Sequence, residues 1–184
     1  NYYNINKEKY YWEERVEANV FTCLNQSISE RVRFLISNRE NVKSLQIFLN
    51  DNNNCRLVVD GKFGPQTQSV LEKEYLIKEN ELVNPSKNEL YLTNDNILKI
   101  VNKDNVLNLQ LEKKKFTRGL NQNIDANWKI GLTSNEIIDN VISFIEVTKI
   151  LPLELKTFEE SKGQVITDYQ NHIETIWLNN LEKK

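Results

Sequence analysis

The strongest folding signal in the chain lies in residues 157–184. Thr157 is followed three residues later by Glu160, the spacing of a capping box, in which two side chains satisfy the free backbone donors at the start of a helix. Beyond it, apolar side chains recur at helical spacing: Val165, Ile166, Tyr169, Ile173, Ile176, Trp177 and Leu181. This pattern predicts a long C-terminal helix. We expect its apolar stripe to pack against the rest of the protein.

The size and charge of the chain exclude several classes of protein. Its 184 residues are 39% hydrophobic and carry 24 Lys and Arg against 26 Asp and Glu, a net charge of −2. This length is enough for one domain of good size or two small ones. The near-balanced charge argues against nucleic acid as a partner, because binding phosphates needs a basic excess or a basic face.

We expect no membrane span and no signal peptide in this sequence. No apolar run approaches the roughly 20 residues that a bilayer requires. No basic segment followed by an apolar one opens the chain, so we expect any export signal to have been removed or to lie outside the sequence.

The cysteine and histidine content argues against metal and nucleophilic chemistry. Cys23, Cys55 and His172 are too few for a structural zinc site, which needs four ligands. We therefore expect no metal and no Cys-His catalytic pair. We also expect no cofactor and no catalytic residue, and we place His172 on the C-terminal helix, either at its surface or half-buried. Cys23 and Cys55 have two alternatives: a disulfide, if the chain is exported, or two free thiols.

Turn residues and hydrophobic periodicity predict an α+β fold. Strands are predicted at 17–23, 106–111 and 141–150, and helices at 27–36, 41–49, 65–75 and 94–101. Pro65 suits the first turn of its helix, and Thr93 or Asn94 caps the helix at 94–101. Residues 82–92, with Pro85 and Ser86, are interpreted as a connector, and residues 119–132 as a long polar loop.

Residues 42–75 contain the first of two motifs. They read V-K-S-L-Q-I-F-L, then L-V-V-D-G-K-F-G-P-Q-T, then S-V-L-E-K-E-Y. Gly61 and Gly64 allow tight-turn backbone, and Phe63 between them is expected to point inward between two helices. Thr67 is expected to hydrogen-bond within the first turn of the next helix.

This segment resembles the small three-helix peptidoglycan-binding domain, whose signature is L-Q-x-x-L followed by V-D-G-x-F-G-x-x-T. The resemblance implies a glycan site on Asp60, Gly61, Phe63, Gly64 and Thr67. The alternative is that these residues only fold a helix-loop-helix, with glycan binding lost.

The flanking segments carry the second motif: K-Y-Y-W-E-E-R-V-E-A at 9–18, F-T-R-G-L-N-Q-N-I-D-A-N-W-K-I-G-L-T at 116–133, and K-T-F-E-E-S-K-G-Q-V-I-T-D-Y-Q at 156–170. Together they are similar to the C-terminal portion of SurA-type periplasmic peptidyl-prolyl isomerases, which contain parvulin modules. The resemblance implies four parts. A linker with the first strand and helix of a degenerate parvulin-like module spans 1–38, an inserted peptidoglycan-binding-like domain 39–92, the rest of the module 93–152, and the C-terminal helix 153–184.

The two active-site histidines of the parvulin family fall, on this mapping, near Asn19 and near Ser143 or Phe144. None of these residues is histidine. The resemblance therefore implies a module without isomerase catalysis. The tyrosines at 2, 3, 10 and 11 form either a packed N-terminal helix or a surface that binds unfolded segments or another subunit.

These observations lead to one expected function and two alternatives. We expect a non-catalytic part of a periplasmic SurA-type chaperone that binds unfolded or outer-membrane client proteins, with an insert that tethers it to peptidoglycan. The first alternative is a structural interaction subunit of a cell-envelope complex. The second is an active prolyl isomerase.

Overall fold

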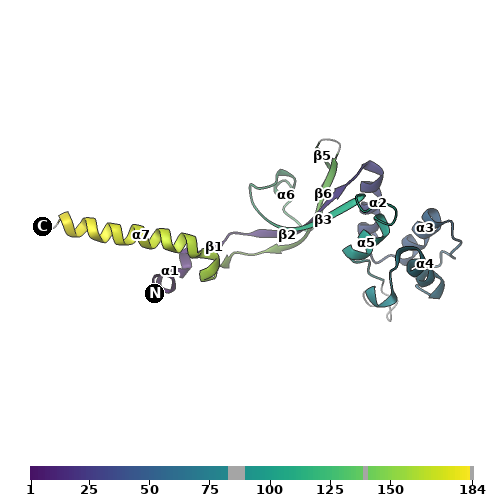
Figure 1. Ribbon diagram of the computed structural model, residues 1–184, viewed down its shortest axis with the longest axis horizontal. Helices are drawn as coiled ribbons and strands as arrows, with labels where there is room; N and C mark the ends of the chain where they lie inside the picture. Colours follow the sequence, from purple (N-terminus) through teal and green to yellow (C-terminus); the bar gives the residue numbers. More distant parts are fainter. Residues whose placement is uncertain (83–89, 139–140, 183–184) are drawn as a thin grey trace. The chain divides into compact units, whose positions relative to one another are not determined.

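The computed structural model of the protein describes residues 1–82, 90–138 and 141–182 and has a mixed α+β fold (Figure 1). The chain divides into two compact units. Unit 1 comprises residues 1–18, 114–131 and 147–184, and unit 2 comprises residues 19–113 and 132–146. The connector expected around Pro85 and Ser86 lies outside the described residues. The four-part division implied by the second motif remains a prediction.

Four helices of unit 2 lie where the sequence predicts them. They are α2 (Gln26–Ser37), α3 (Val42–Asn53), α4 (Pro65–Tyr75) and α5 (Asn94–Val101), with a short 3₁₀ turn, η2, at Glu79–Glu81. The side chains of Asn25, Asn41 and Thr93 each accept a hydrogen bond from a backbone N–H in the first turn of α2, α3 and α5. Helix α3 runs past the predicted end at Leu49, and the left-handed residue Asn54 follows it.

The larger sheet has the strand order β3-β2-β6-β4, with β5 also paired to β6. Its strands are β2 (Arg15–Cys23), β3 (Leu109–Thr117), β4 (Gly131–Leu132), β5 (Glu136–Ile138) and β6 (Val141–Leu151). The pairing of β5 with β6 is antiparallel and places Glu136 opposite Ser143. The strands predicted at 17–23 and 141–150 are confirmed by β2 and β6.

The strand predicted at 106–111 is wrong in its first half, because β3 begins only at Leu109. Asn102 binds both backbone groups of Leu109 through its side chain, and Asn105 accepts a hydrogen bond from the N–H of Leu107. These side chain–backbone bonds form a turn in place of a sheet ladder. The predicted polar loop at 119–132 likewise contains a short helix, α6 (Gln122–Asp125), and strand β4.

The core of unit 2 is formed by the inner faces of the helices and the sheet. Phe21 of β2 and Phe144 of β6 stack with ring centroids 5.0 Å apart. Around them lie fully buried aliphatic side chains from the helices and their connections: Leu35, Leu45, Leu49, Leu71, Ile77, Leu92, Ile97 and Ile100. Burying such apolar surface is the main favourable contribution to folding.

Unit 1 packs an aromatic N-terminus against the C-terminal helix α7 (Phe158–Glu182). Its smaller elements are α1 (Tyr2–Asn6), the 3₁₀ turn η1 (Lys7–Lys9), and strands β1 (Tyr11–Trp12) and β7 (Glu154–Leu155), which pair antiparallel. Tyr2 lies against Tyr169 with a centroid distance of 5.4 Å, and Tyr3 lies against Phe158 at 5.5 Å. This packing supports the first interpretation, a packed N-terminal helix, for Tyr2 and Tyr3, whereas Tyr10 follows η1 and Tyr11 lies exposed in β1.

Tyr10 is the most buried member of this aromatic group. Its hydroxyl donates a hydrogen bond of 2.9 Å to the carboxylate of Asp168 in α7. Burial and this carboxylate together raise the pKa of Tyr10 to about 12.

The predicted capping box is present at the start of α7. The N–H of Thr157 donates to the carboxylate of Glu160 at 2.9 Å, and the N–H of Glu160 donates to the hydroxyl of Thr157 at 3.3 Å. The hydrogen bonds that the Glu160 carboxylate accepts from the N–H and the hydroxyl of Thr157 lower the pKa of Glu160. None of the described helices, α7 included, combines the length and apolar content needed to cross a membrane.

The expectation that the apolar stripe of α7 is packed is wrong for most of its length. Ser161 and Val165 are the buried residues of this helix within its described part. The five-residue helix α1 reaches α7 at Phe158, through Tyr3, and around Tyr169 and His172, where Tyr2 lies 5.4 Å from both rings. An amphipathic pattern identifies the apolar face of a helix, but it does not supply an element long enough to cover that face.

Candidate functional site

The glycine-containing loop at Asp60–Gly64 is organised around one buried amide, that of Gln46 in α3. Gln46 is 2% exposed. Its nitrogen donates to a carboxylate oxygen of Asp60 at 2.9 Å and to the carbonyl of Lys62 at 3.1 Å, and its oxygen accepts from the N–H of Gly61 at 2.9 Å. The glutamine of the L-Q-x-x-L pattern therefore fixes the loop that carries the rest of the motif.

The structure brings Asp60, Gly61 and Thr67 together around Gln46. The Gln46 amide and the N–H of Lys62 both donate to the Asp60 carboxylate, which lowers its pKa. Gly61 has a φ of +76°, a conformation that favours glycine. Thr67 is buried, with its hydroxyl 3.5 Å from the Gln46 nitrogen.

Phe63 and Gly64 have structural roles in core packing and at the start of α4. Phe63 is half-buried and packs against the core, as its position between the glycines predicts. The expectation that Gly64 provides a turn conformation is wrong, because it is extended, with a φ of −135°, and precedes α4 as its N-cap. A Cβ atom at Gly64 would meet nothing within 4 Å, so neither its backbone nor its surroundings require glycine.

A polar hollow of about 400 Å³ lies beside Gly61. It is lined by Gly61 and by residues from the end of α2, the connection and the start of α3: Ser37, Asn38, Glu40, Asn41, Val42 and Lys43. Hydroxyl, amide, carboxylate and ammonium groups in one hollow suit a polar, uncharged or zwitterionic ligand. Of the predicted glycan residues, Gly61 is the one that this lining includes. The motif gave no signal for residues 37–43, because only the tertiary fold brings them beside the loop.

The positions mapped to the parvulin histidines are occupied by side chains that pack or bond within unit 2. Asn19 donates to Glu146 at 2.9 Å, and Glu146 forms an ion pair of 3.1 Å with Arg39. Arg39 also donates to Tyr91 and Asn94. Phe144 is fully buried beneath the guanidinium of Arg33, which lies 4.2 Å from its ring centroid. The Arg39–Glu146 pair is nearly buried and links β2, β6 and the α2–α3 connection.

Both cysteines are free thiols in the structure. Cys23 is buried, and burial raises its pKa to about 11. Cys55 is half-buried, and its thiol donates to the carbonyl of Leu49 at 3.2 Å. Within the described part of the chain, no three His, Cys, Asp or Glu side chains are placed to bind a metal ion.

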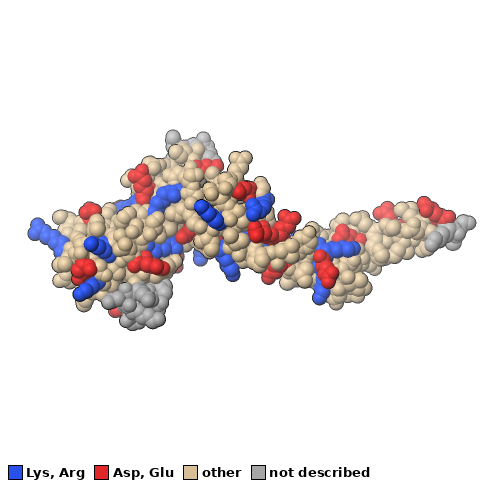
Figure 2. Space-filling view, turned by 180° about the vertical axis from the view of Figure 1, so that it is seen from behind, with Lys and Arg blue, Asp and Glu red and all other residues tan. Residues whose placement is uncertain are grey.

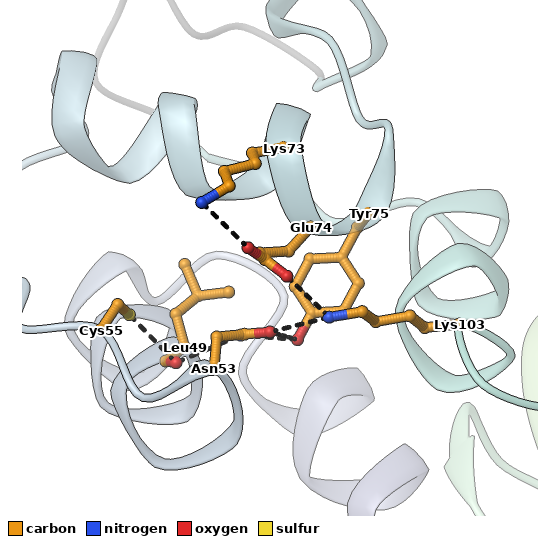
Figure 3. A network of polar contacts seen from close by, with 7 residues as sticks. All are labelled: Leu49, Asn53, Cys55, Lys73, Glu74, Tyr75 and Lys103. Carbon is orange, nitrogen blue, oxygen red and sulfur yellow. Dashed lines mark hydrogen bonds and ion pairs between the residues drawn. The ribbon is translucent and has the colours of Figure 1, made fainter.

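Figure 3 shows that Cys55 lies beside a polar network between α3, α4 and the segment after α5. Asn53 and Tyr75 exchange hydrogen bonds through the Asn53 amide and the Tyr75 hydroxyl. Lys103 forms an ion pair of 2.8 Å with Glu74. This pair lowers the pKa of Glu74 and raises that of Lys103. These contacts join elements of one unit to each other, so we assign the network to folding.

A second candidate surface is the exposed apolar side of the C-terminal helix. We define the α7 apolar face as Ile166, Tyr169, Ile173, Ile176, Trp177 and Leu181, whose exposed fractions lie between 44% and 61%. A shallow, mostly apolar hollow of about 460 Å³ lies on it, lined by Tyr169, Gln170, Ile173, Glu174 and Trp177. The sequence predicted the members of this face, but it did not predict their exposure.

Charged side chains of both signs are interspersed on the side of the molecule drawn in Figure 2. This mixture agrees with the near-balanced total charge of the chain. An extended apolar face is therefore the more unusual surface feature, and large exposed apolar patches mark interaction sites.

Comparisons with known proteins add little to these observations. No protein-family model matches the sequence, and a search of curated proteins finds no match. A solved structure comes from work on the virulence factor PEB4 and the periplasmic protein Cj1289, two structurally related SurA-like chaperones of Campylobacter jejuni. It aligns with all of this chain and 59% of its own length, at 14% identity and a TM-score of 0.26.

This chain therefore spans less than two thirds of the length of that structure. The similarity to SurA-like chaperones is weak, and function has to be argued from the residues of this chain. Neither of the two sequence resemblances is supported by a matching family model.

Proposed function

We propose that this chain binds unfolded protein segments through the α7 apolar face, as a non-catalytic part of a periplasmic SurA-type chaperone that assists outer-membrane or secreted proteins. The observation that carries the proposal is the exposure of six large apolar side chains along one helix. The periplasmic setting rests on the two sequence resemblances at 42–75 and at 9–18, 116–133 and 156–170.

The composition of the face favours unfolded chains as its ligands. Covering apolar surface yields roughly 25 cal/mol per Å², and this contribution is non-directional, so it does not require one fixed partner shape. The face combines aliphatic with aromatic side chains, which accept varied apolar sequences. Unfolded outer-membrane proteins expose alternating apolar residues that fit such a surface.

The test is suppression of aggregation of a urea-denatured outer-membrane protein diluted into buffer. The intact chain is expected to suppress it at modest molar excess. A variant of the face, Ile173→Ser/Trp177→Ser, is expected to lose most of this effect. The control, Thr167→Ser/Asn171→Ser, changes exposed polar residues of the same helix and is expected to retain it. Equal suppression by both variants would contradict the proposal.

A second candidate activity is peptidoglycan binding at the polar hollow beside Gly61. The lining by Ser37, Asn38, Glu40 and Lys43 favours it over a purely structural motif. The test is co-sedimentation with purified sacculi, comparing the intact chain with Glu40→Gln/Lys43→Ala. Both residues are exposed, so this variant spares the core, and Lys73→Ala serves as the control. If the intact chain does not sediment with the sacculi, the motif serves only the fold.

The two alternatives give different results in the same assays. A structural interaction subunit would bind a folded envelope partner without suppressing client aggregation. An active isomerase would accelerate the cis–trans conversion of a Xaa-Pro peptide, a reaction with a barrier of about 20 kcal/mol. Measurable acceleration by this chain would overturn the assignment as a non-catalytic part.

A further inference from the structure

The charge on the C-terminal helix has one sign over most of its length. Between Lys162 and Lys183 the sequence contains three charged residues, Asp168, Glu174 and Glu182, and all are carboxylates. Twenty residues of an exposed amphipathic helix would ordinarily carry both signs. Within this segment the charged groups beside the α7 apolar face are therefore carboxylates, and Lys162 and Lys183 flank the segment in the sequence.

The three carboxylates differ in their relation to the α7 apolar face. Asp168 is half-buried and accepts the hydrogen bond from Tyr10. Glu174 lines the hollow together with Tyr169, Ile173 and Trp177. Glu182 does not line the hollow and is exposed. It follows Ile173 by nine residues, which at about 100° per residue places it on the opposite side of the helix from Ile173. Glu174 is thus the carboxylate that a ligand in the hollow would contact.

Glu174 is placed so that its charge affects which ligands bind in the hollow. It is three residues before Trp177 and four after Gln170, so these side chains share one helix face. A segment that covers Ile173 and Trp177 would also exclude water from part of the Glu174 carboxylate. A positive charge on the bound segment beside Glu174 then becomes more favourable and a negative charge more costly, since the effective dielectric constant around the carboxylate falls.

We propose that the hollow on α7 selects unfolded segments in which an apolar–aromatic stretch is flanked by lysine or arginine, with Glu174 pairing with that cation. This inference rests on the proposed function and names the class of client.

Other occupants fit this charge pattern less well. An anionic lipid surface or a nucleic acid would be repelled by Glu174, and residues 163–182 offer no Lys or Arg to attract either. A second copy of the same face would bring carboxylates toward carboxylates. In a cation-flanked apolar segment, the apolar stretch can pack on the apolar side chains of the hollow while the cation pairs with Glu174.

The experiment measures binding of fluorescent peptides to the intact chain by anisotropy at low salt. Three peptides share one apolar–aromatic core and differ in their flanks, which are lysine, serine or glutamate. The lysine peptide is expected to bind about three- to fivefold more tightly than the serine peptide, the range of one partly exposed ion pair. The glutamate peptide is expected to bind more weakly than both, and high salt should reduce these differences.

Two matched variants locate the effect on the helix. Glu174→Gln is expected to bind the three peptides alike, and Glu174→Lys to prefer the glutamate peptide. The control Glu182→Gln removes the same charge from outside the hollow and is expected to retain the lysine preference.

The outcomes separate this inference from the function on which it rests. Equal binding of all three peptides by the intact chain would overturn the inference and leave client binding standing. Binding of none of them would overturn both. A dimer that Trp177→Ser dissociates in sedimentation would assign the face to self-association and overturn the inference as well.

Discussion

At the scale of single residues, the buried amide of Gln46 determines the shape of the motif loop. Gln46→Glu keeps the side-chain shape but removes the donors to Asp60 and Lys62, and it places two carboxylates within hydrogen-bonding distance. We predict a loss of about 2–3 kcal/mol in the free energy of unfolding at neutral pH, from lost and unsatisfied hydrogen bonds. Urea denaturation measures it.

The pH dependence of this loss has a definite sign. The loss should shrink as the pH falls toward about 4, because one of the two carboxyl groups then takes up a proton and becomes a donor. The control Gln66→Glu lies at an exposed position in the first turn of α4 and should change stability little. A pH-independent loss would show that the Gln46–Asp60 hydrogen bond is not its source.

The two thiols are predicted to react at very different rates. Cys23 is buried with a pKa near 11, whereas Cys55 is half-buried. With iodoacetamide at about pH 8, Cys55 should be alkylated in the native protein and Cys23 only in urea, because the thiolate is the reactive form. Mass spectrometry of tryptic peptides reads both sites. If neither cysteine reacts in urea before a reductant is added, the two form a disulfide.

The raised pKa of Cys23 also predicts how stability changes with pH. The folded state retains the thiol proton more tightly than the unfolded state, whose pKa is near 9.0. The contribution of Cys23 is therefore fully present below about pH 9 and is lost as the pH rises toward 11. In Cys23→Ala this part of the alkaline loss should be absent.

At the scale of elements, the Arg39–Glu146 ion pair connects the α2–α3 segment to the sheet. Its side chains are 11% and 13% exposed, and Asn19 of β2 also donates to Glu146. Glu146→Ala leaves Arg39 as a buried charge without its partner, so we predict a destabilisation of about 3–5 kcal/mol. The exposed pair Lys115–Glu17 is the control, and Glu17→Ala should cost less than about 1 kcal/mol. Equal losses in thermal unfolding would contradict the assigned role.

The elements also show what the sequence alone could predict. Hydrophobic spacing was sufficient for α2 and α3 and for strands β2 and β6, and Pro65 and the Thr93 or Asn94 cap added to it for α4 and α5. The start of β3 was missed, because side chains of Asn102 and Asn105 bond to the backbone there. Such local competition leaves no signal in hydrophobic spacing.

For the candidate site, sequence reasoning identified the loop but not the hollow. The resemblance of the motif implied Asp60, Gly61, Phe63, Gly64 and Thr67, of which Asp60, Gly61 and Thr67 lie around Gln46. The lining by Ser37–Lys43 depends on how two segments meet in the fold. The apolar face of α7 was predicted from its spacing, but its exposure depends on the length of α1, which spacing in α7 does not encode.

At the scale of the whole molecule, the two units offer different surfaces. Unit 2 contains the large apolar core and the polar hollow beside Gly61. Unit 1 contains the aromatic N-terminus and the α7 apolar face. A net charge of −2 over 184 residues gives little long-range attraction for any ligand. We therefore expect recognition to depend on short-range apolar contact and on single charges such as Glu174.

The most direct measurement is site-specific photocrosslinking of the intact chain to an unfolded outer-membrane protein. A photoreactive phenylalanine analogue is placed in turn at Ile173 and Trp177 of the α7 apolar face, and at Thr167 and Asn171 as controls on the same helix. We predict strong crosslinks from positions 173 and 177, weak ones from 167 and 171, and none to the same client after it has folded. Equal yields from all four positions, or crosslinks that persist with the folded client, would contradict binding of unfolded clients to the α7 apolar face.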